Sequence, residues 1–219
     1  MENNVKKYLN DLLVRYPVLK NCEKDILDTF NILEKSYLKG GKLLLVGNGG
    51  SAADSEHIVG ELMKSFKLRR HIDEEYKKKL ISIDKEKGSI LAKNLQGSLP
   101  AIALDGHPAL STAYMNDCVP VLGFAQQVSG FGNENDVLFC ISTSGNSENV
   151  IYAAVVAKAK NMKVIGLTGE KISKLSKISD ACINAPEVET FKIQELHLPI
   201  YHCLCLMLEE RFFGLLDIK

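Results

Sequence analysis

The chain has 219 residues, of which 46% are hydrophobic and 25% are charged, and its 27 basic residues balance its 27 acidic residues. This length suits one domain with a full hydrophobic core and is too short for two large domains. A net charge of zero argues against a nucleic-acid-binding protein, which would carry a basic excess. We therefore expect a single domain over residues 1–219 that binds no nucleic acid.

The sequence predicts a cytoplasmic protein with no membrane partner. Its N-terminal stretch, MENNVKKYLNDLLVRYP, lacks the apolar segment and the small-residue cleavage site of a secretory signal. Nowhere does an apolar run approach the ~20 residues that cross a bilayer. The six cysteines form no Cys-x-x-Cys pair, so we expect reduced thiols rather than disulfides.

The first forty residues carry a helical pattern. Apolar side chains recur there at helical spacing, with a break near Tyr16 and Pro17. The spacing predicts two amphipathic helices within residues 1–40, the second of which ends at Gly40 and Gly41. Apolar terminal helices favour packing between subunits, so we expect them to contribute to an oligomer.

Beyond these helices, short apolar runs alternate with helical patterns. The predicted strands are residues 42–46, 101–104, 137–142, 163–168 and 181–185. The predicted helices are residues 51–66, 111–115, 121–129, 149–160, 172–178 and 190–213. Strands separated by helices form a parallel sheet that is covered on both faces. The sequence therefore predicts an α/β fold.

Residues 68–100 interrupt this alternation. The stretch is rich in Lys and Glu and contains no obvious strand. A connection longer than ~15 residues usually has a role or a helix of its own. We expect a mainly helical insertion with a solvated charged face; an active-site lid and a disordered segment are the alternatives.

Two Gly/Ser-rich loops follow predicted strands and open predicted helices. Residues 47–54 read GNGGSAAD, and residues 141–147 read ISTSGNS. Unpaired N–H groups and the helix dipole at such positions favour an anion. The second loop adds the hydroxyl donors Ser142, Thr143, Ser144 and Ser147. Because parallel sheets bind ligands beyond the carboxyl ends of their strands, the loops predict a site for a phosphate monoester.

Polar side chains on two helices are candidates for acid/base or metal chemistry. His57 and Glu61 are four residues apart on the helix that Ser51 could cap, so they share one face. Such a pair holds a metal ion or supplies a base and its partner; a solvated surface pair is the alternative. His197 and His202 lie on the apolar C-terminal helix, where a core hydrogen bond is the alternative for each.

Gln194 and His202 are eight residues apart, which in a straight helix is about 12 Å of rise and roughly 80° of rotation. Both could barely reach one ion. Either Pro199 distorts the helix or a symmetric neighbour supplies one of the two groups, and we expect a site shared between subunits. Asn116 and Asp117, at another helix end, could bind sugar hydroxyls; a helix C-cap is the alternative.

The motifs GNGGSAADxxH, ISTSGNSENV and IQELHxxxxH together resemble the sugar isomerase (SIS) domain family and, within it, the phosphoheptose isomerases. The resemblance covers most of the chain outside residues 68–100. It implies a three-layer α/β/α sandwich of flavodoxin-like type, with a five-stranded parallel sheet, N-terminal helices and a long C-terminal helix. It also implies a homotetramer with active sites at subunit interfaces.

The resemblance assigns roles to particular residues. It makes Ser51, Ser142, Thr143, Ser144 and Ser147 phosphate ligands. It places Asn48, Gly49, Gly50, Asn116, Asp117, Glu61 and Gln194 against the sugar. It matches a zinc site to His57, Glu61, Gln194 and His202. Within that set Glu61 and His202 are the acid/base pair, and because Gln is an unusual zinc ligand we expect a weakly bound ion.

The implied reaction converts sedoheptulose 7-phosphate to D-glycero-D-manno-heptose 7-phosphate through a cis-enediol. A carboxylate removes the carbon-bound proton, an imidazole serves the oxygens, and zinc stabilises the enediolate. Phe191 departs from the pattern, because some family members carry an acidic residue there. The alternatives are an isomerase of another phosphosugar and a non-catalytic adaptor that binds a protein partner such as the replication initiator; retention of the four zinc-site residues favours catalysis.

Overall fold

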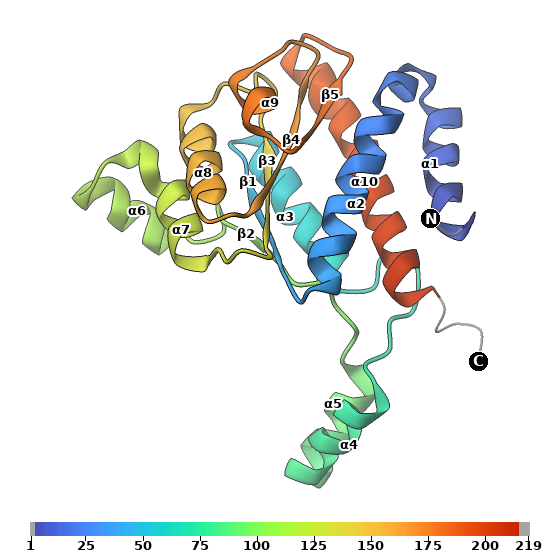
Figure 1. The fold of residues 1–219 in the computed structure, drawn as a ribbon. Helices are drawn as coiled ribbons and strands as arrows, with labels where there is room; N and C mark the ends of the chain where they lie inside the picture. Colours follow the sequence, from blue (N-terminus) through green and yellow to red (C-terminus); the bar gives the residue numbers. More distant parts are fainter. Residues whose placement is uncertain (1–2, 215–219) are drawn as a thin grey trace.

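The computed structural model describes residues 3–214 and contains a sheet of five parallel strands (Figure 1). The strands are β1 (Leu43–Val46), β2 (Ala101–Ala103), β3 (Val137–Ile141), β4 (Lys163–Gly169) and β5 (Ala181–Ala185). Their order across the sheet is β2-β1-β3-β4-β5. Each predicted strand is confirmed to within one or two residues, because a short apolar run followed by Gly or polar residues marks a buried parallel strand.

Successive side chains of β1 and β3 point to opposite faces of the sheet and enter two separate cores. Leu43, Leu45 and Phe139 belong to one core, whereas Leu44 and Leu138 belong to the other. All of these side chains are buried. Helices therefore cover the sheet on both faces, which confirms the predicted three-layer α/β/α arrangement.

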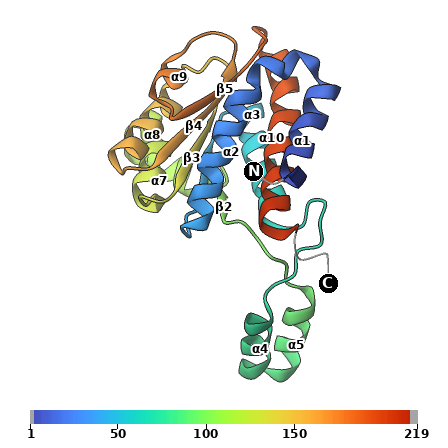
Figure 2. The same cartoon turned by 45° about the vertical axis from the view of Figure 1, so that its right-hand side comes forward.

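One face of the sheet carries the N-terminal helices and the C-terminal helix (Figures 1 and 2). These helices are α1 (Asn3–Arg15), α2 (Glu23–Leu38), α3 (Gly50–Met63) and α10 (Thr190–Phe213). The break that was predicted near Pro17 is a 3-10 helix, η1 (Pro17–Cys22), which Pro17 begins. α3 ends three residues before the predicted boundary.

The other face carries a second group of helices. They are α7 (Gly123–Phe131), α8 (Glu148–Ala159) and α9 (Lys174–Ile178), with α6 (Pro108–Asp117) and the short η2 (Pro120–Leu122) beside them. α6 is longer than predicted because His107 and Pro108 start it one turn earlier. α9 begins two residues late because Ser173 and Ser176 form a capping box.

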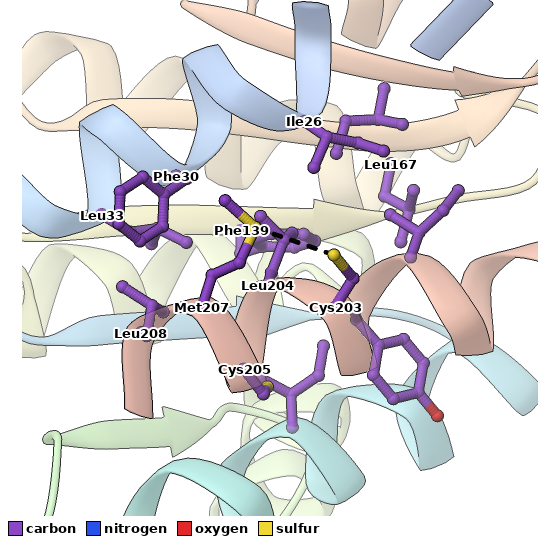
Figure 3. Close-up of a cluster of buried hydrophobic side chains, with 14 of the residues drawn as sticks. Ile26, Phe30, Leu33, Phe139, Leu167, Cys203, Leu204, Cys205, Met207 and Leu208 are labelled. Atoms are coloured by element: carbon purple, nitrogen blue, oxygen red, sulfur yellow. Dashed lines mark hydrogen bonds between the residues drawn. The ribbon is translucent and has the colours of Figure 1, made fainter. Parts of the chain in front are cut away.

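α10 forms the centre of the first core and is buried along most of its length. Figure 3 shows Leu204, Met207 and Leu208 of this helix among Phe30 of α2 and Phe139 of β3. The helix runs without interruption through Pro199, which lies inside it. The free cysteines Cys203 and Cys205 are part of this packing, as expected of reduced thiols.

Residues 68–100 contain two helices, α4 (Glu74–Ile83) and α5 (Lys85–Asn94), which form a hairpin that extends away from the sheet (Figures 1 and 2). Asp73 and Asp84 cap the two helices by accepting bonds from backbone N–H groups. A bridge between His71 and Gln96 closes the base of the hairpin. None of the helices between residues 3 and 214 combines the length and apolar composition of a membrane span.

His197 is a core residue of α10. Its side chain is fully buried, and its Nε2 lies 3.2 Å from the carbonyl oxygen of Thr168 on β4, to which it donates. Burial lowers the pKa of His197 from its ordinary value of 6.5 to about 4. The buried imidazole is therefore neutral at pH 7, in agreement with the core hydrogen bond that was one of the two interpretations.

The low pKa of His197 predicts acid destabilisation. The unfolded chain binds a proton at this residue below pH 6.5, whereas the folded chain binds it only below about 4. The free energy of unfolding should therefore fall by about 3 kcal/mol between these two pH values. Urea unfolding of the protein and of His197→Gln, which keeps a donor but does not titrate, measures this difference. Parallel stability curves for the two proteins between pH 8 and pH 4 would contradict the prediction.

Candidate active site

The two Gly/Ser-rich loops begin side by side at the carboxyl edge of the sheet. Val46 at the end of β1 pairs in register with Cys140 of β3, so the loops leave neighbouring strands at the same level. The side-chain amides of Asn48 and Asn149 join the loops through two reciprocal hydrogen bonds of 3.0 and 2.8 Å. This contact fixes the first loop against the start of α8.

The backbone of both loops requires glycine. Gly49 has φ of 56° and Gly145 has φ of 62°, a conformation that side chains with a Cβ rarely adopt. At Gly145 a Cβ would also overlap the hydroxyl of Ser173. The positive φ at Gly49 turns the chain from β1 into α3, and Ser51 is buried in the first turn of that helix.

The predicted phosphate ligands of the second loop divide into two pairs. Ser142 and Ser147 face one another, with their hydroxyl oxygens 3.1 Å apart, and Ser147 is the N-cap residue of α8. Thr143 and Ser144 line a neighbouring cavity of about 280 Å³, which Lys171 also borders. The loop therefore presents hydroxyls in two places beside the N-terminus of α8, a position at which an oxyanion is favoured.

A chain of polar contacts links α3 to α10. The hydroxyl of Tyr201 donates to Oδ1 of Asp54 at 3.2 Å, and Nδ1 of His57 lies 3.0 Å from the same hydroxyl oxygen. Burial and the charge of Asp54 raise the pKa of Tyr201 far above its ordinary range, so the phenol keeps its proton. Because that proton is given to Asp54, the hydroxyl oxygen accepts from His57, which places the imidazole proton on Nδ1.

The other nitrogen of His57 faces Glu61. Nε2 of His57 lies 3.3 Å from Oε1 of Glu61. When the imidazole carries a single proton, on Nδ1, this contact brings together two hydrogen-bond acceptors. The contact is favourable when a proton or a metal cation lies between the two atoms. The predicted i, i+4 pair is thus in direct contact, with the Glu61 side chain 11% and the His57 side chain 43% exposed.

His202 completes this cluster within the same chain. Its ring lies 5.0 Å from the ring of His57 and 5.4 Å from that of Phe66, measured between ring centroids. Nε2 of His202 is buried without a hydrogen-bond partner among the described residues. Burial, followed by the neighbouring His57, lowers the pKa of His202 although the charge of Glu61 opposes this. The proposed acid/base pair therefore shares one environment.

The donor set of this cluster fits a zinc ion in its chemistry. Two imidazoles and a carboxylate are common zinc ligands. Oε2 of Glu61, like Nε2 of His202, is buried without a hydrogen bond, and the nearest cation, Lys64, is 3.8 Å away. Within residues 3–214 no three His, Cys, Asp or Glu side chains already stand at coordinating geometry.

Gln194 lies against the start of α3. Its side-chain amide packs on Gly50 at the start of α3, where a Cβ would collide with it. Gly50 precedes His57 by seven residues, or about 10 Å along the helix. Gln194 and His202 therefore both face α3 of their own chain, and the predicted sharing of the site between subunits stays a prediction.

Asn116 and Asp117 lie at the exposed end of α6, where the Asn116 amide donates to the Asp117 carboxylate at 2.8 Å. The cap of this helix is Cys118. Met115 of the same helix lines a cavity of about 290 Å³ together with Asn48 and Gly49. The structure thus brings α6 to the first loop, and the pair itself points into solvent.

Three residues of this region were missed by the sequence analysis. They are Asp54, Asn149 and Tyr201. Asp54 lies three residues before His57, on the same face of α3, which is a signal that the sequence does contain. Tyr201 bonds to His57, which lies 144 residues away, and Asn149 bonds to Asn48, which lies 101 residues away. No local sequence pattern indicates such contacts.

Comparisons with known proteins find relatives that match most of the chain. Residues 85–169 match the family model of the SIS domain. The chain is 32% identical to the phosphoheptose isomerase of Rhodospirillum rubrum, over 96% of this chain and 98% of that protein. It is 40% identical to the phosphoheptose isomerase of Nitratiruptor sp., over 78% of each chain.

Solved structures of similar fold lead to the same group of proteins. The phosphoheptose isomerase from Francisella tularensis superposes with a TM-score of 0.72 at 30% identity, over 94% of this chain and 96% of that one. The phosphoheptose isomerase from Neisseria gonorrhoeae superposes with a TM-score of 0.68 at 28% identity, over 91% and 95% of the two chains.

Replacement of Tyr201 by Phe tests the polar chain. The variant removes the acceptor that places the His57 proton on Nδ1, so we expect a mixture of the two neutral imidazole forms. Long-range ¹H–¹⁵N NMR of the histidine rings above pH 8 distinguishes them. Loss of such an orienting contact typically lowers metal affinity or turnover about 10- to 100-fold. A wild-type His57 that is protonated on Nε2 would contradict the interpretation.

Proposed function

This chain belongs to the phosphoheptose isomerase family and is a phosphosugar isomerase, and we propose that it converts sedoheptulose 7-phosphate to D-glycero-D-manno-heptose 7-phosphate. We further propose that it acts in the cytoplasm as a homotetramer. The substrate is suggested by the names of its relatives and by the two kinds of group that the site combines.

One observation carries the proposal: the neighbouring strands β1 and β3 lead into α3, which carries Glu61, and into the hydroxyl-rich loop before α8. The loop after β3 presents hydroxyls at the N-terminus of α8, and the loop after β1 opens the helix that carries Glu61. A phosphate held by Ser142 and Ser147 would leave the sugar chain free to extend toward α3. The reacting carbons lie at the opposite end of a heptulose 7-phosphate from its phosphate, which suits this separation.

In the proposed reaction Glu61 removes the proton from C1 of the ketose and returns one to C2. Its side chain is only 11% exposed, so the carboxylate works away from bulk water. His202 moves protons between the sugar oxygens, and its lowered pKa keeps the imidazole neutral and ready to accept. Asp54 and Tyr201 hold His57 in place beside the carboxylate.

We propose that zinc binds at His57, Glu61 and His202, with Gln194 as a further ligand. The support is the contact between two acceptor atoms, His57 Nε2 and Glu61 Oε1, together with the two buried atoms that lack partners. When bound, zinc would stabilise the negative charge that develops on the substrate oxygens. The ring nitrogen of His57 is already oriented for this by its contact with Tyr201.

Glu61→Gln tests the role of the carboxylate. The variant keeps the shape of the side chain and loses the base, so we expect kcat to fall by about three orders of magnitude or more. Binding of inorganic phosphate, measured by calorimetry, should change less than threefold because Ser142 and Ser147 lie on the loop before α8 and Ser51 lies ten residues before Glu61. Turnover of sedoheptulose 7-phosphate by the wild type, with and without a chelator, is the reference. Unchanged turnover in Glu61→Gln would contradict the proposed role of Glu61 as the base.

The oligomer is tested by light scattering. A homotetramer of this 24.2 kDa chain should give four times that mass. A fully active monomer would exclude a site that is shared between subunits.

A further inference from the structure

We infer that Arg70 and Glu209 are positioning residues for the reaction. They hold the carboxyl end of α3 against α10 and thereby keep Glu61 in register with His202. The inference rests on the proposed function in one respect, because Glu61 is the base only if that function is right. The geometry that carries the inference is independent of the substrate.

Arg70 binds the backbone of Glu61 itself. Its guanidinium donates to the carbonyl oxygen of Glu61 from Nη2 and to that of Leu62 from Nη1, both at 2.7 Å. These carbonyls lie in the last turn of α3, where the intrahelical ladder ends and a cation is favourable. The Arg70 side chain is completely buried, so water cannot take its place.

Glu209 of α10 holds the same guanidinium from the other side. Nε of Arg70 donates to Oε1 of Glu209 at 2.8 Å. The carboxylate also accepts from the backbone N–H groups of Phe66, Lys67 and Leu68, at 2.8, 2.9 and 3.1 Å. One buried side chain of α10 thus fixes the whole segment that leaves α3.

The consequence for the site follows from helix geometry. Glu209 lies seven residues after His202, or about two turns along the same helix. A displacement of the Arg70–Glu209 contact would therefore slide or tilt the end of α3 relative to α10. Such a movement would carry Glu61 away from His202, while the loops after β1 and β3 stayed in place.

Stability alone does not account for this arrangement. A buried ion pair gains little net free energy, because the desolvation of both charges offsets their attraction. The planar fork of Arg, in contrast, specifies direction: it reaches two carbonyls and a carboxylate at once, which a Lys ammonium does with less geometric definition. The pair is suited to holding a position.

The test compares Arg70→Lys with a matched control. Lys42→Met removes a second ion pair of similar design, in which nearly buried Asp136 also accepts from the backbone N–H groups of Lys42 and Asn133. That pair joins the residues that precede β1 and β3 and shares no hydrogen bond with Arg70, Glu209 or the polar cluster of α3 and α10. Both variants should lose thermal stability, and circular dichroism selects a temperature at which each is folded.

We expect Arg70→Lys to lower kcat by at least about tenfold, since small misplacements of a catalytic group have effects of this size. KM should change less than threefold, and Zn²⁺ affinity, measured by competition with a chromophoric chelator, should fall with kcat. In crystals the Glu61 carboxylate should move relative to His57 and His202. Lys42→Met should keep kcat and Zn²⁺ affinity within twofold and Glu61 in place.

The inference is overturned if Arg70→Lys behaves as Lys42→Met does, with lower stability, unchanged kcat and an unmoved Glu61. Arg70→Met removes the whole guanidinium and should lower kcat further. If this variant does not fold, the result for Arg70→Lys decides whether Arg70 positions Glu61. If the wild type fails to turn over sedoheptulose 7-phosphate, the proposed function is contradicted and the positioning role of Arg70 is not. The crystal comparison of Glu61 would then still decide whether Arg70 positions it.

Discussion

Parallel pairing of β1 with β3 is the constraint on which the site depends. Because the strands run in the same direction and in register, both carboxyl ends reach the same edge of the sheet, and the loops that follow them open helices at one level. The hydrogen-bonded side chains of Asn48 and Asn149 then join the two loops, although these residues are 101 positions apart in the sequence. An offset of the register would separate the hydroxyl loop from the helix that carries His57 and Glu61.

α10 meets two demands that normally conflict. It is the most deeply packed helix of its layer, and it also carries buried polar side chains. Each of these groups is directed to a different element: His197 to β4, Tyr201 to α3, and Glu209 to the segment after α3. Since a buried polar group without a partner is costly, these contacts fix the rotation and the axial position of the helix together. The apolar and the polar contacts of α10 thus specify the same position of this helix against the sheet and α3.

The local signals in the sequence were sufficient for the elements and for the loops, and insufficient for the contacts between them. The apolar runs and the Gly/Ser loops located the five strands, because the spacing of apolar residues along a short stretch of sequence distinguishes strands from helices. Motif resemblance then assigned His57, Glu61 and His202, which the structure brings together. The links from Arg70 to Glu209 and from Tyr201 to Asp54 span 139 and 147 residues. They depend on how α3 lies on α10, which no spacing rule contains.

The two halves of the site differ in how they would treat charge. The loop after β3 offers hydroxyls and N–H groups, which can hold a phosphate without a fixed positive charge close to Glu61. The cluster on α3 and α10 holds the largely buried Glu61 carboxylate beside the imidazoles of His57 and His202, where a shared cation or proton would satisfy the facing atoms of His57 and Glu61. Beside the largely buried Glu61, the field of such a cation would act strongly on the nearby carbonyl of a substrate and weakly on a phosphate several bonds away. Because the hydroxyl loop and the cluster of α3 and α10 lie on different elements, tight phosphate binding and strong polarisation of the carbonyl could coexist.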